Sequence, residues 1–283
     1  SDTVLVTGAA GMIGSYVCKN LLNAGFKVIG LDRRAADADN NNYLHITADL
    51  DGKAGLDAIF SEHRPDRVIH LAALAHTAGV KDLSYEAYYK INVACAQNVF
   101  EVADKYSVPV LFISTVDVYG FVKGKADCSL TPHPVTVYGK TKAMAEEKLR
   151  AVCRSYDIFR FSPVYTDEIK RDIQKRYYLK YPNVAYIIGK GTDCEFLNIK
   201  TAADKLTAWV TGDVTNKTYN IKDRDRISTS ECLKAERASG RAKYILRFPR
   251  WLVKLGFGAA VLLTGKNKYT YLLNKAVNPL RTE

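Results

Sequence analysis

Short runs of apolar, often β-branched residues alternate along the chain with segments whose apolar residues recur every three or four positions. Side chains repeat every two residues in a strand and every 3.6 in a helix, so the runs predict buried strands and the periodic segments predict helices. Strands are predicted at 4–7, 27–31, 43–48, 67–71, 110–114 and 158–161, and helices at 12–23, 56–62, 85–107 and 137–156. This alternation predicts an α/β fold, a doubly wound parallel (Rossmann) sheet.

The rhythm changes after residue 157. Helices are predicted at 170–179 and 201–210, strands at 185–188 and 218–221, and a basic helical segment from 228 onward. We expect a dinucleotide-binding domain over 1–160, to which 197–222 returns. Residues 161–196 and 223–283 then form a smaller, interleaved C-terminal substrate lobe.

The composition is that of a globular protein: 283 residues, 47% hydrophobic and 25% charged. We find no apolar run of about 18 residues and no signal peptide before the first strand, so we expect a cytoplasmic protein without a membrane span. The six cysteines form no Cys-x-x-Cys pair and none lies near a histidine at metal-binding spacing. We therefore expect reduced thiols and no metal site.

Positive charge is concentrated in the second half. Residues 1–150 hold 16 Lys+Arg against 17 Asp+Glu, whereas residues 151–283 hold 25 against 13. The substrate lobe is therefore basic, which fits an anionic substrate such as a sugar nucleotide; a merely solvated basic surface is the alternative.

Gly8, Gly11 and Gly14 follow the first predicted strand and open the first predicted helix. Glycines in this position allow a tight turn and a close approach of backbone to a dinucleotide pyrophosphate. Asp32 follows Gly14 by 18 residues, near the spacing of the carboxylate that binds ribose hydroxyls, which favours NAD. Arg33 and Arg34 leave NADP open, because a guanidinium there can accept a 2′-phosphate.

Tyr138 and Lys142 are four residues apart on a predicted helix, so they share a face. A phenol beside a cation loses its proton more readily, which predicts a general acid/base next to a redox cofactor.

These segments occur in the order in which the extended short-chain dehydrogenase/reductases carry them. The chain most resembles the sugar-nucleotide epimerase/dehydratase branch of that family, across residues 1–150. The segments that carry the resemblance are 7–14 (TGAAGMIG), 49–50 (DL), 70–73 (HLAA), 114–120 (STVDVYG) and 138–142 (YGKTK).

The resemblance implies roles for individual residues. Tyr138 is the catalytic base, Lys142 assists it and binds the cofactor ribose, and Thr115 bridges the substrate oxygen and Tyr138. Further residues expected to contact the cofactor are Met12 and Ile13 at the pyrophosphate, Asp49 and Leu50 at the adenine, Leu71, Ala72 and Ala73 near the nicotinamide, and Asn92, Ser114 and Ser162. His76 is expected near the substrate.

The chain departs from this branch in two places. The 4,6-dehydratases carry Thr-Asp-Glu where this chain has Thr115-Val116-Asp117, so the acid that assists water loss is missing and we disfavour a lyase. Relatives also place an arginine before the aromatic residue that Phe196 matches, as a pyrophosphate clamp. Lys170, Arg171, Lys175 and Arg176 are candidates to rebuild that clamp; a solvated basic helix is the alternative.

The C-terminal segment 234–281 holds 11 basic residues and one acidic residue, interspersed with aromatic and aliphatic side chains. This composition admits a peripheral membrane contact or a basic-faced helix packed on the core. No nucleic-acid-binding motif is present, so we expect no nucleic-acid partner.

The leading functional prediction is an NAD-dependent epimerase, an isomerase, acting on a sugar nucleotide through a transient keto-sugar. An NAD(P)-dependent reductase or dehydrogenase of a keto-sugar or a hydrophobic alcohol or ketone is the first alternative. A non-catalytic dinucleotide-sensing protein is the second. We also expect a homodimer.

Overall fold

Seven parallel strands form the central sheet of the computed structural model, which describes residues 2–37, 40–75 and 83–283. The strand order is β13-β7-β5-β4-β1-β2-β3. The strands are β1 (Thr3–Thr7), β2 (Lys27–Asp32), β3 (Tyr43–Thr47), β4 (Arg67–His70), β5 (Val110–Thr115), β7 (Tyr156–Phe161) and β13 (Thr218–Ile221). The order reverses direction at β1, and the carboxyl ends of the strands on either side of such a point form the usual ligand-binding edge. The predicted Rossmann fold is confirmed.

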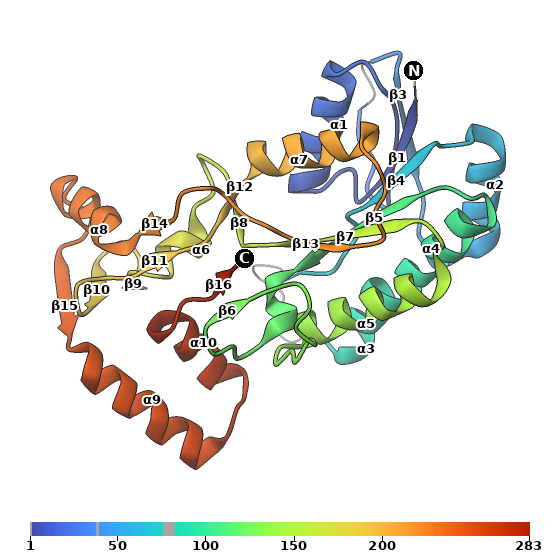
Figure 1. Cartoon of the computed structure of the whole chain (residues 1–283). Coiled ribbons are helices and arrows are strands. Elements are labelled where there is room, and N and C mark those ends of the chain that lie inside the picture. Colours follow the sequence, from blue (N-terminus) through green and yellow to red (C-terminus); the bar gives the residue numbers. More distant parts are fainter. Residues whose placement is uncertain (1, 38–39, 76–82) are drawn as a thin grey trace.

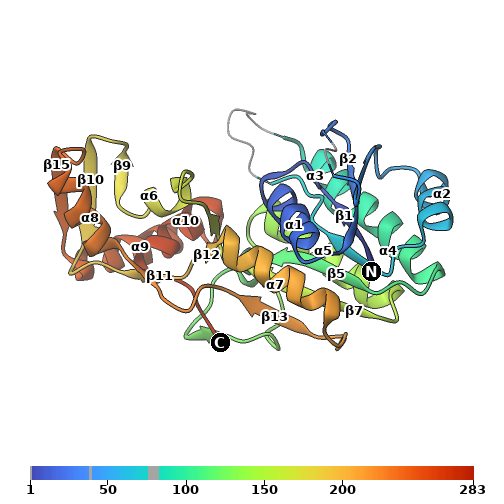
Figure 2. The same ribbon diagram turned by 90° about the horizontal axis from the view of Figure 1, so that it is seen from above.

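Helices cover both faces of this sheet (Figures 1 and 2). On one face α1 (Met12–Asn23) and α7 (Ile199–Thr211) pack over Val4 and Val6. On the other face α2 (Lys53–His63), α4 (Ala96–Lys105) and α5 (Val137–Val152) pack over Leu5 and Val68. Successive strand residues point to opposite faces, so strands that are apolar throughout are buried on both sides.

The predicted helix at 85–107 consists of three segments. α3 (Tyr85–Tyr89) leads into a π-helical turn, η1 (Lys90–Cys95), and then into α4. A π-helical turn inserts an extra residue and rotates the side chains that follow, and such turns are frequent at functional sites. Asn92 lies in this turn and is buried.

The substrate lobe contains more β-structure than its sequence predicts. Residues 170–179 are not one helix: α6 (Arg171–Gln174) is a single turn and the chain then extends into β9 (Tyr178–Lys180). The segment after 228 is not wholly helical either, because α8 (Thr229–Ala238) is followed by β15 (Tyr244–Phe248). β15 and β9 flank β10 (Val184–Ile188) in a three-stranded sheet, a long-range pairing that local periodicity does not encode.

Short paired strands join the two parts of the molecule. β8 (Val164–Tyr165) pairs with β12 (Leu197–Asn198), and β11 (Asp193–Cys194) pairs with β14 (Ile227–Ser228). β13 then returns the chain to the main sheet beside β7. The domain limits at 160, 197 and 222 remain a prediction.

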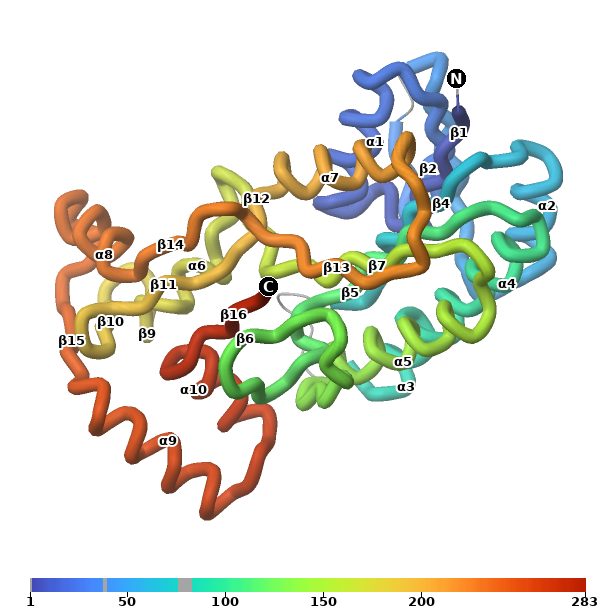
Figure 3. Tube along the Cα trace, in the orientation of Figure 1, coloured from blue at the N-terminus to red at the C-terminus, as the bar shows by residue number. Residues whose placement is uncertain are grey.

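Two helices end the chain. α9 (Arg250–Thr264) runs along the outside of the substrate lobe, and α10 (Lys268–Val277) turns back toward the main sheet (Figure 3). β16 (Arg281–Thr282) then pairs with β6 (Lys125–Ala126), in the loop region that follows β5. Within 2–37, 40–75 and 83–283, no helix combines the length and the apolar character needed to cross a bilayer.

Candidate active site

The glycine-rich turn brings α1 directly against the end of β1. Gly8 has φ +70°, and a Cβ there would lie 2.8 Å from the Ala72 nitrogen; a Cβ on Gly14 would overlap the Gly8 carbonyl oxygen. α1 begins after Gly11 with no capping side chain and no acidic residue in its first turn. No side chain competes for the first amides of α1, and the contact of Met12 and Ile13 with a ligand phosphate stays a prediction.

Asp32 ends β2 beside this turn. Its carboxylate accepts hydrogen bonds from the Ala10 amide at 3.0 Å and from the Arg34 amide at 2.9 Å, and the Arg34 guanidinium pairs with it at 3.2 Å. Burial acts to raise the pKa of Asp32, but the Arg34 and Ala10 hydrogen bonds outweigh it and the net pKa is lowered. Arg34, rather than Arg33, is thus the guanidinium that meets Asp32.

Asn92 is buried and its amide is committed within the protein. Its Oδ1 accepts from the Leu74 amide at 2.7 Å, and its Nδ2 donates to the Leu74 carbonyl and to Thr141 Oγ1, both at 3.0 Å. Asn92 therefore joins the loop after β4, which includes Leu71–Ala73, to the helix that carries Tyr138. We interpret it as a positioning residue; an exposed helix-surface amide is excluded.

Tyr138 and Lys142 lie in the first turns of α5. Lys142 is 2% exposed, and its ammonium lies 4.3 Å from the centre of the Phe112 ring. Burial lowers the pKa of Lys142 to about 7, although the nearby Glu146 carboxylate acts in the opposite direction.

The phenol of Tyr138 does not behave as the sequence predicts in the protein alone. Burial raises the pKa of Tyr138 above its usual range, and the Asp117 carboxylate raises it further. The lowering of the Tyr138 pKa expected from Lys142 stays a prediction for the protein with its cofactor bound. Desolvation dominates because Lys142 is buried and Tyr138 is half-buried.

Thr115 ends β5 and caps the short 3-10 helix η2 (Val116–Tyr119), where its Oγ1 accepts from the Asp117 amide at 3.2 Å. This leaves the hydroxyl proton of Thr115 available to donate to a substrate oxygen. Asp117 lies two residues further on. Its Oδ1 accepts from Tyr271 at 2.9 Å and from the Lys275 ammonium at 2.7 Å.

Ser114, predicted to contact the cofactor, lies on the inner side of β5. Its hydroxyl donates to Glu146 Oε1 at 2.6 Å. Glu146 also holds the fully buried Arg160 through two hydrogen bonds of 3.0 and 2.7 Å. This ion pair ties α5 to β7, and Ser114 supports it; the predicted contact of Ser114 with the cofactor stays a prediction.

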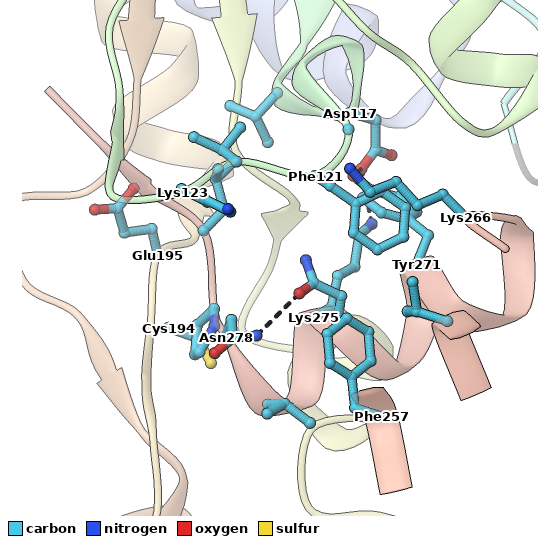
Figure 4. Close-up of a pocket in the computed structure, with 18 of the residues that line it drawn as sticks. Asp117, Phe121, Lys123, Cys194, Glu195, Phe257, Lys266, Tyr271, Lys275 and Asn278 are labelled. Carbon is cyan, nitrogen blue, oxygen red and sulfur yellow. Dashed lines mark hydrogen bonds and ion pairs between the residues drawn. The ribbon is translucent and has the colours of Figure 1, made fainter. Parts of the chain in front are cut away.

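A cavity of about 830 Å³ extends from the end of β5 to α9 and α10 (Figure 4). Ser162, Asp117 and Glu195 line it together with five basic residues: Lys123, Arg176, Arg250, Lys266 and Lys275. Both acids are neutralised, since Asp117 pairs with Lys275 and Glu195 pairs with Lys222 at 3.0 Å. The cavity therefore carries a net positive charge.

Arg176 and Arg171, two of the candidates for a phosphate clamp, differ in position. Arg176 lines the cavity, lies 5.8 Å from the Phe196 ring and donates to the Lys275 carbonyl at 3.1 Å. Arg171 is exposed and is not among the lining residues. Arg176 therefore lies beside Phe196, whereas Arg171 is in solvent. His76 lies outside the described residues.

Comparison with known proteins decides the family. The model of the NAD-dependent epimerase/dehydratase family matches residues 4–175, more than half of the chain. The chain belongs to this family. Within residues 4–175 lie the glycine turn, Thr115, Tyr138 and Lys142. The family is described as NAD-dependent, so the prediction of NAD as cofactor is confirmed at this level.

Curated relatives include both chemistries of this epimerase/dehydratase family. UDP-glucose 4-epimerase 4 of Oryza sativa subsp. japonica is 38% identical over 55% of this chain and 46% of its own length. The dTDP-glucose 4,6-dehydratase of Neisseria gonorrhoeae is 32% identical over 54% of this chain and 51% of its own. The aligned part thus spans about half the length of these relatives. Whether the chain is an isomerase or a lyase is not decided by them.

Solved structures extend the likeness to most of the fold. The UDP-glucose 4-epimerase of Thermus thermophilus, a complex with NAD, has a TM-score of 0.67 and 25% identity, over 87% of this chain and 86% of its own. The UDP-glucose 4-epimerase of Thermotoga maritima, solved with UDP-glucose, has a TM-score of 0.70 and 26% identity, over 87% and 85%.

Three features of this family member fit a dinucleotide. The first turn of α1 has no capping side chain, Asp32 presents a carboxylate at the end of β2, and the Lys142 ammonium is buried against the Phe112 ring. The cofactor contacts predicted for Met12, Ile13, Asp49, Leu50, Leu71, Ala72, Ala73, Asn92, Ser114 and Ser162 stay predictions.

Sequence analysis missed the residues that α10 contributes. Tyr271 and Lys275 lie more than 150 positions from Asp117 and fall in a segment whose basic composition pointed to a surface. Glu146 was also missed. A carboxylate four residues after Lys142 on one helix face was the only local signal for it.

Proposed function

We propose that the chain is an NAD-dependent epimerase that acts on a sugar nucleotide through a transient keto-sugar. The observation that carries this proposal is a cavity lined by five basic side chains that begins at Val116 and Asp117, the two residues directly after Thr115. Tyr138 exchanges a proton with the sugar, and the basic side chains that line the cavity bind the diphosphate. The UDP-sugar 4-epimerases among the relatives support the same substrate class.

NAD, when bound, supplies the hydride acceptor that turns a sugar alcohol into a ketone and the donor that reverses this. The chain itself moves the proton: the Tyr138 phenolate removes it from the sugar hydroxyl and returns it after the ketone has turned over. Thr115 orients the reacting oxygen through its free hydroxyl proton. Lys142 binds ribose hydroxyls and adds a positive charge that lowers the pKa of Tyr138 when it is protonated.

Two side chains argue against dehydration. Val116 cannot protonate a leaving hydroxyl, and the Asp117 carboxylate is paired with Lys275 and bonded to Tyr271. A carboxylate in an ion pair is stabilised as the base, so it is a poor proton donor. We therefore favour inversion at a carbon over loss of water.

The test is NMR and mass spectrometry of sugar nucleotides incubated with the purified protein. An epimerase produces an isomer of unchanged mass and retains a deuterium placed on the inverted carbon, with no net consumption of added cofactor. A dehydratase product is lighter by one water. Consumption of NADH or NADPH in step with product supports a reductase, and bound NAD without turnover of any sugar nucleotide supports the sensing alternative.

A further inference from the structure

The helix α9 is apolar almost all round, and yet the described part of the chain leaves the outer side of this helix uncovered. Lys254 is the only charged residue between Trp251 and Leu263. None of the fifteen residues of α9 is buried. Leu263 is 85% exposed and Trp251 is 65% exposed. A helix with an apolar surface all round is normally found inside a protein core or in contact with lipid.

The exposed apolar surface is continuous in sequence with its neighbours. Of the twenty large apolar or aromatic side chains that are exposed within the described ranges, ten lie between 244 and 272. They are Tyr244, Leu246, Phe248, Trp251, Leu252, Leu255, Leu262, Leu263, Tyr269 and Leu272. Such a concentration marks an interaction surface rather than scattered exposure.

The charges that flank α9 all have one sign. Between residues 237 and 282 the chain contains no aspartate or glutamate. Exposed cations stand before, within and after the helix, at Arg247, Lys254, Lys266 and Lys268. An apolar helix with a tryptophan near its start and basic residues beyond both ends matches the layering of a bilayer interface, with acyl chains inside and anionic headgroups outside.

We propose that α9 is a membrane-docking helix that lies in the surface of an anionic bilayer. Fifteen residues of helix extend about 22 Å, less than the roughly 30 Å of a hydrocarbon core, so α9 lies along the surface and does not cross it. Its outward face, formed by Trp251, Leu255 and Leu263, enters the lipid. Figure 3 shows α9 standing away from the main sheet, between β15 and α10, where a flat surface can reach it.

Docking would place the substrate cavity at the membrane surface. Phe257 and Val261, on the side of α9 away from Leu255, line that cavity. One helix therefore separates the cavity from the proposed lipid face. This inference concerns the location of the protein and does not depend on the chemistry proposed for the cavity.

A second copy of the chain fits this face less well. Pairing α9 with its own copy would bring together two sets of cations without any acid between 237 and 282 to offset them. An anionic surface neutralises the same charges. We therefore treat a homodimer through α9 as an outcome that the experiment must distinguish.

The experiment is sedimentation of the full chain with phosphatidylcholine vesicles, with and without phosphatidylglycerol. Trp251 is a built-in reporter, since the other tryptophan, Trp209, is buried in α7. We expect binding that requires phosphatidylglycerol, with a blue shift of fluorescence that the Trp251→Phe variant does not show. Raising the salt from about 0.1 M to 1 M should weaken binding, because the Debye length falls from about 10 to 3 Å.

The decisive variant is Leu255→Glu/Leu263→Glu. It should lower vesicle affinity about tenfold or more, since burial of each leucine is worth at least that factor. The matched control is Leu44→Glu/Leu179→Glu, which makes the same charge change at exposed leucines outside α9 and should bind as the unmutated chain does. Lys254→Glu provides a milder variant if the first folds poorly.

Either of two results would overturn the proposal. One is the absence of phosphatidylglycerol-dependent binding, or binding that the α9 variant does not reduce. The other is a dimer, detected by analytical ultracentrifugation, that dissociates in the α9 variant while neither protein binds vesicles. The second result would assign the face to another copy of the chain.

Discussion

Lys275 holds Asp117 across a sequence separation of 158 residues, with its ammonium 2.7 Å from Oδ1. Tyr271, one helical turn earlier on α10, bonds the same oxygen at 2.9 Å. The end of the chain is thereby attached to the loop after β5, two residues beyond Thr115. The C-terminal segment thus contributes to the candidate site as well as to the surface of the molecule.

Asp117→Asn should change the pH dependence of turnover. The Asp117 charge raises the pKa of Tyr138, so its removal should lower that pKa and move the base-dependent limb of the pH–rate profile to lower pH. Loss of the charged bonds to α10 should also cost about 1.5–3 kcal/mol of stability. A variant that is less stable but has an unshifted profile would limit Asp117 to a structural role.

Tyr138→Phe should reduce turnover by about 10²-fold or more, the scale of a lost acid/base group, while NAD binding stays nearly unchanged. The phenol oxygen is the only atom removed, and the uncapped amides of α1 and Asp32 remain. Turnover with a sugar nucleotide and NAD titration by fluorescence measure the two effects. Tyr85→Phe, at an exposed tyrosine, is the control. Activity within a few-fold of the unmutated chain would remove Tyr138 from the mechanism.

Lys142→Met should abolish activity and yet stabilise the ligand-free protein. The pKa of Lys142 is lowered to about 7 by burial, from 10.5, so between these pH values only the unfolded chain binds the proton and stability rises with pH. Below about pH 7 the full desolvation penalty is present. At about pH 6 the methionine variant should therefore exceed the unmutated chain by on the order of a few kcal/mol, and the difference should shrink toward about pH 10.

Urea unfolding across this pH range measures that difference. Lys140→Met, at an exposed lysine two residues away on α5, should show no such pH dependence. Equal or lower stability of the Lys142 variant at about pH 6 would mean that the buried ammonium is better compensated than its surroundings indicate.

The sheet and the glycine turn could be predicted because their information is local. Parallel strands buried on both faces appear as apolar runs, and Gly8, Gly11 and Gly14 mark a turn that accepts no larger residue at Gly14. The substrate lobe could not be predicted, since β15 pairs with β10, some 60 residues earlier in the chain. The π-helical turn at Asn92 could not be predicted either, because it leaves no signal in the periodicity of apolar residues. Burial could not be predicted either, because it is also a long-range property. The spacing of Tyr138 and Lys142 is visible in the sequence, but the desolvation that sets their pKa values depends on the assembled core.

Asp32→Ala should weaken NAD binding more than NADP binding, because the carboxylate holds ribose hydroxyls and repels a 2′-phosphate. Arg34 adds a specific expectation. Freed from its ion pair with Asp32, its guanidinium becomes available to a 2′-phosphate, so the variant should shift toward NADP. Fluorescence titration of both dinucleotides measures this, with Arg33→Ala as the control. Tighter NADP than NAD binding in the unmutated chain would contradict a carboxylate-controlled preference.

Arg176→Ala should raise the Michaelis constant for a sugar nucleotide about tenfold or more, whereas the maximal rate changes less, because a lost charge-assisted bond is worth about 1.5–3 kcal/mol. Arg176 lines the cavity beside Phe196, so its loss removes one of the cations placed to hold a diphosphate. Arg171→Ala removes the same charge from the same segment but from an exposed position, and should leave the Michaelis constant nearly unchanged.

Salt provides a second test of the same contact. It should raise the Michaelis constant of the unmutated chain and raise that of the Arg176 variant less, since screening acts on a contact that the variant has already lost. Equal effects of the two substitutions would mean that general basic charge, rather than a clamp at Phe196, attracts the substrate.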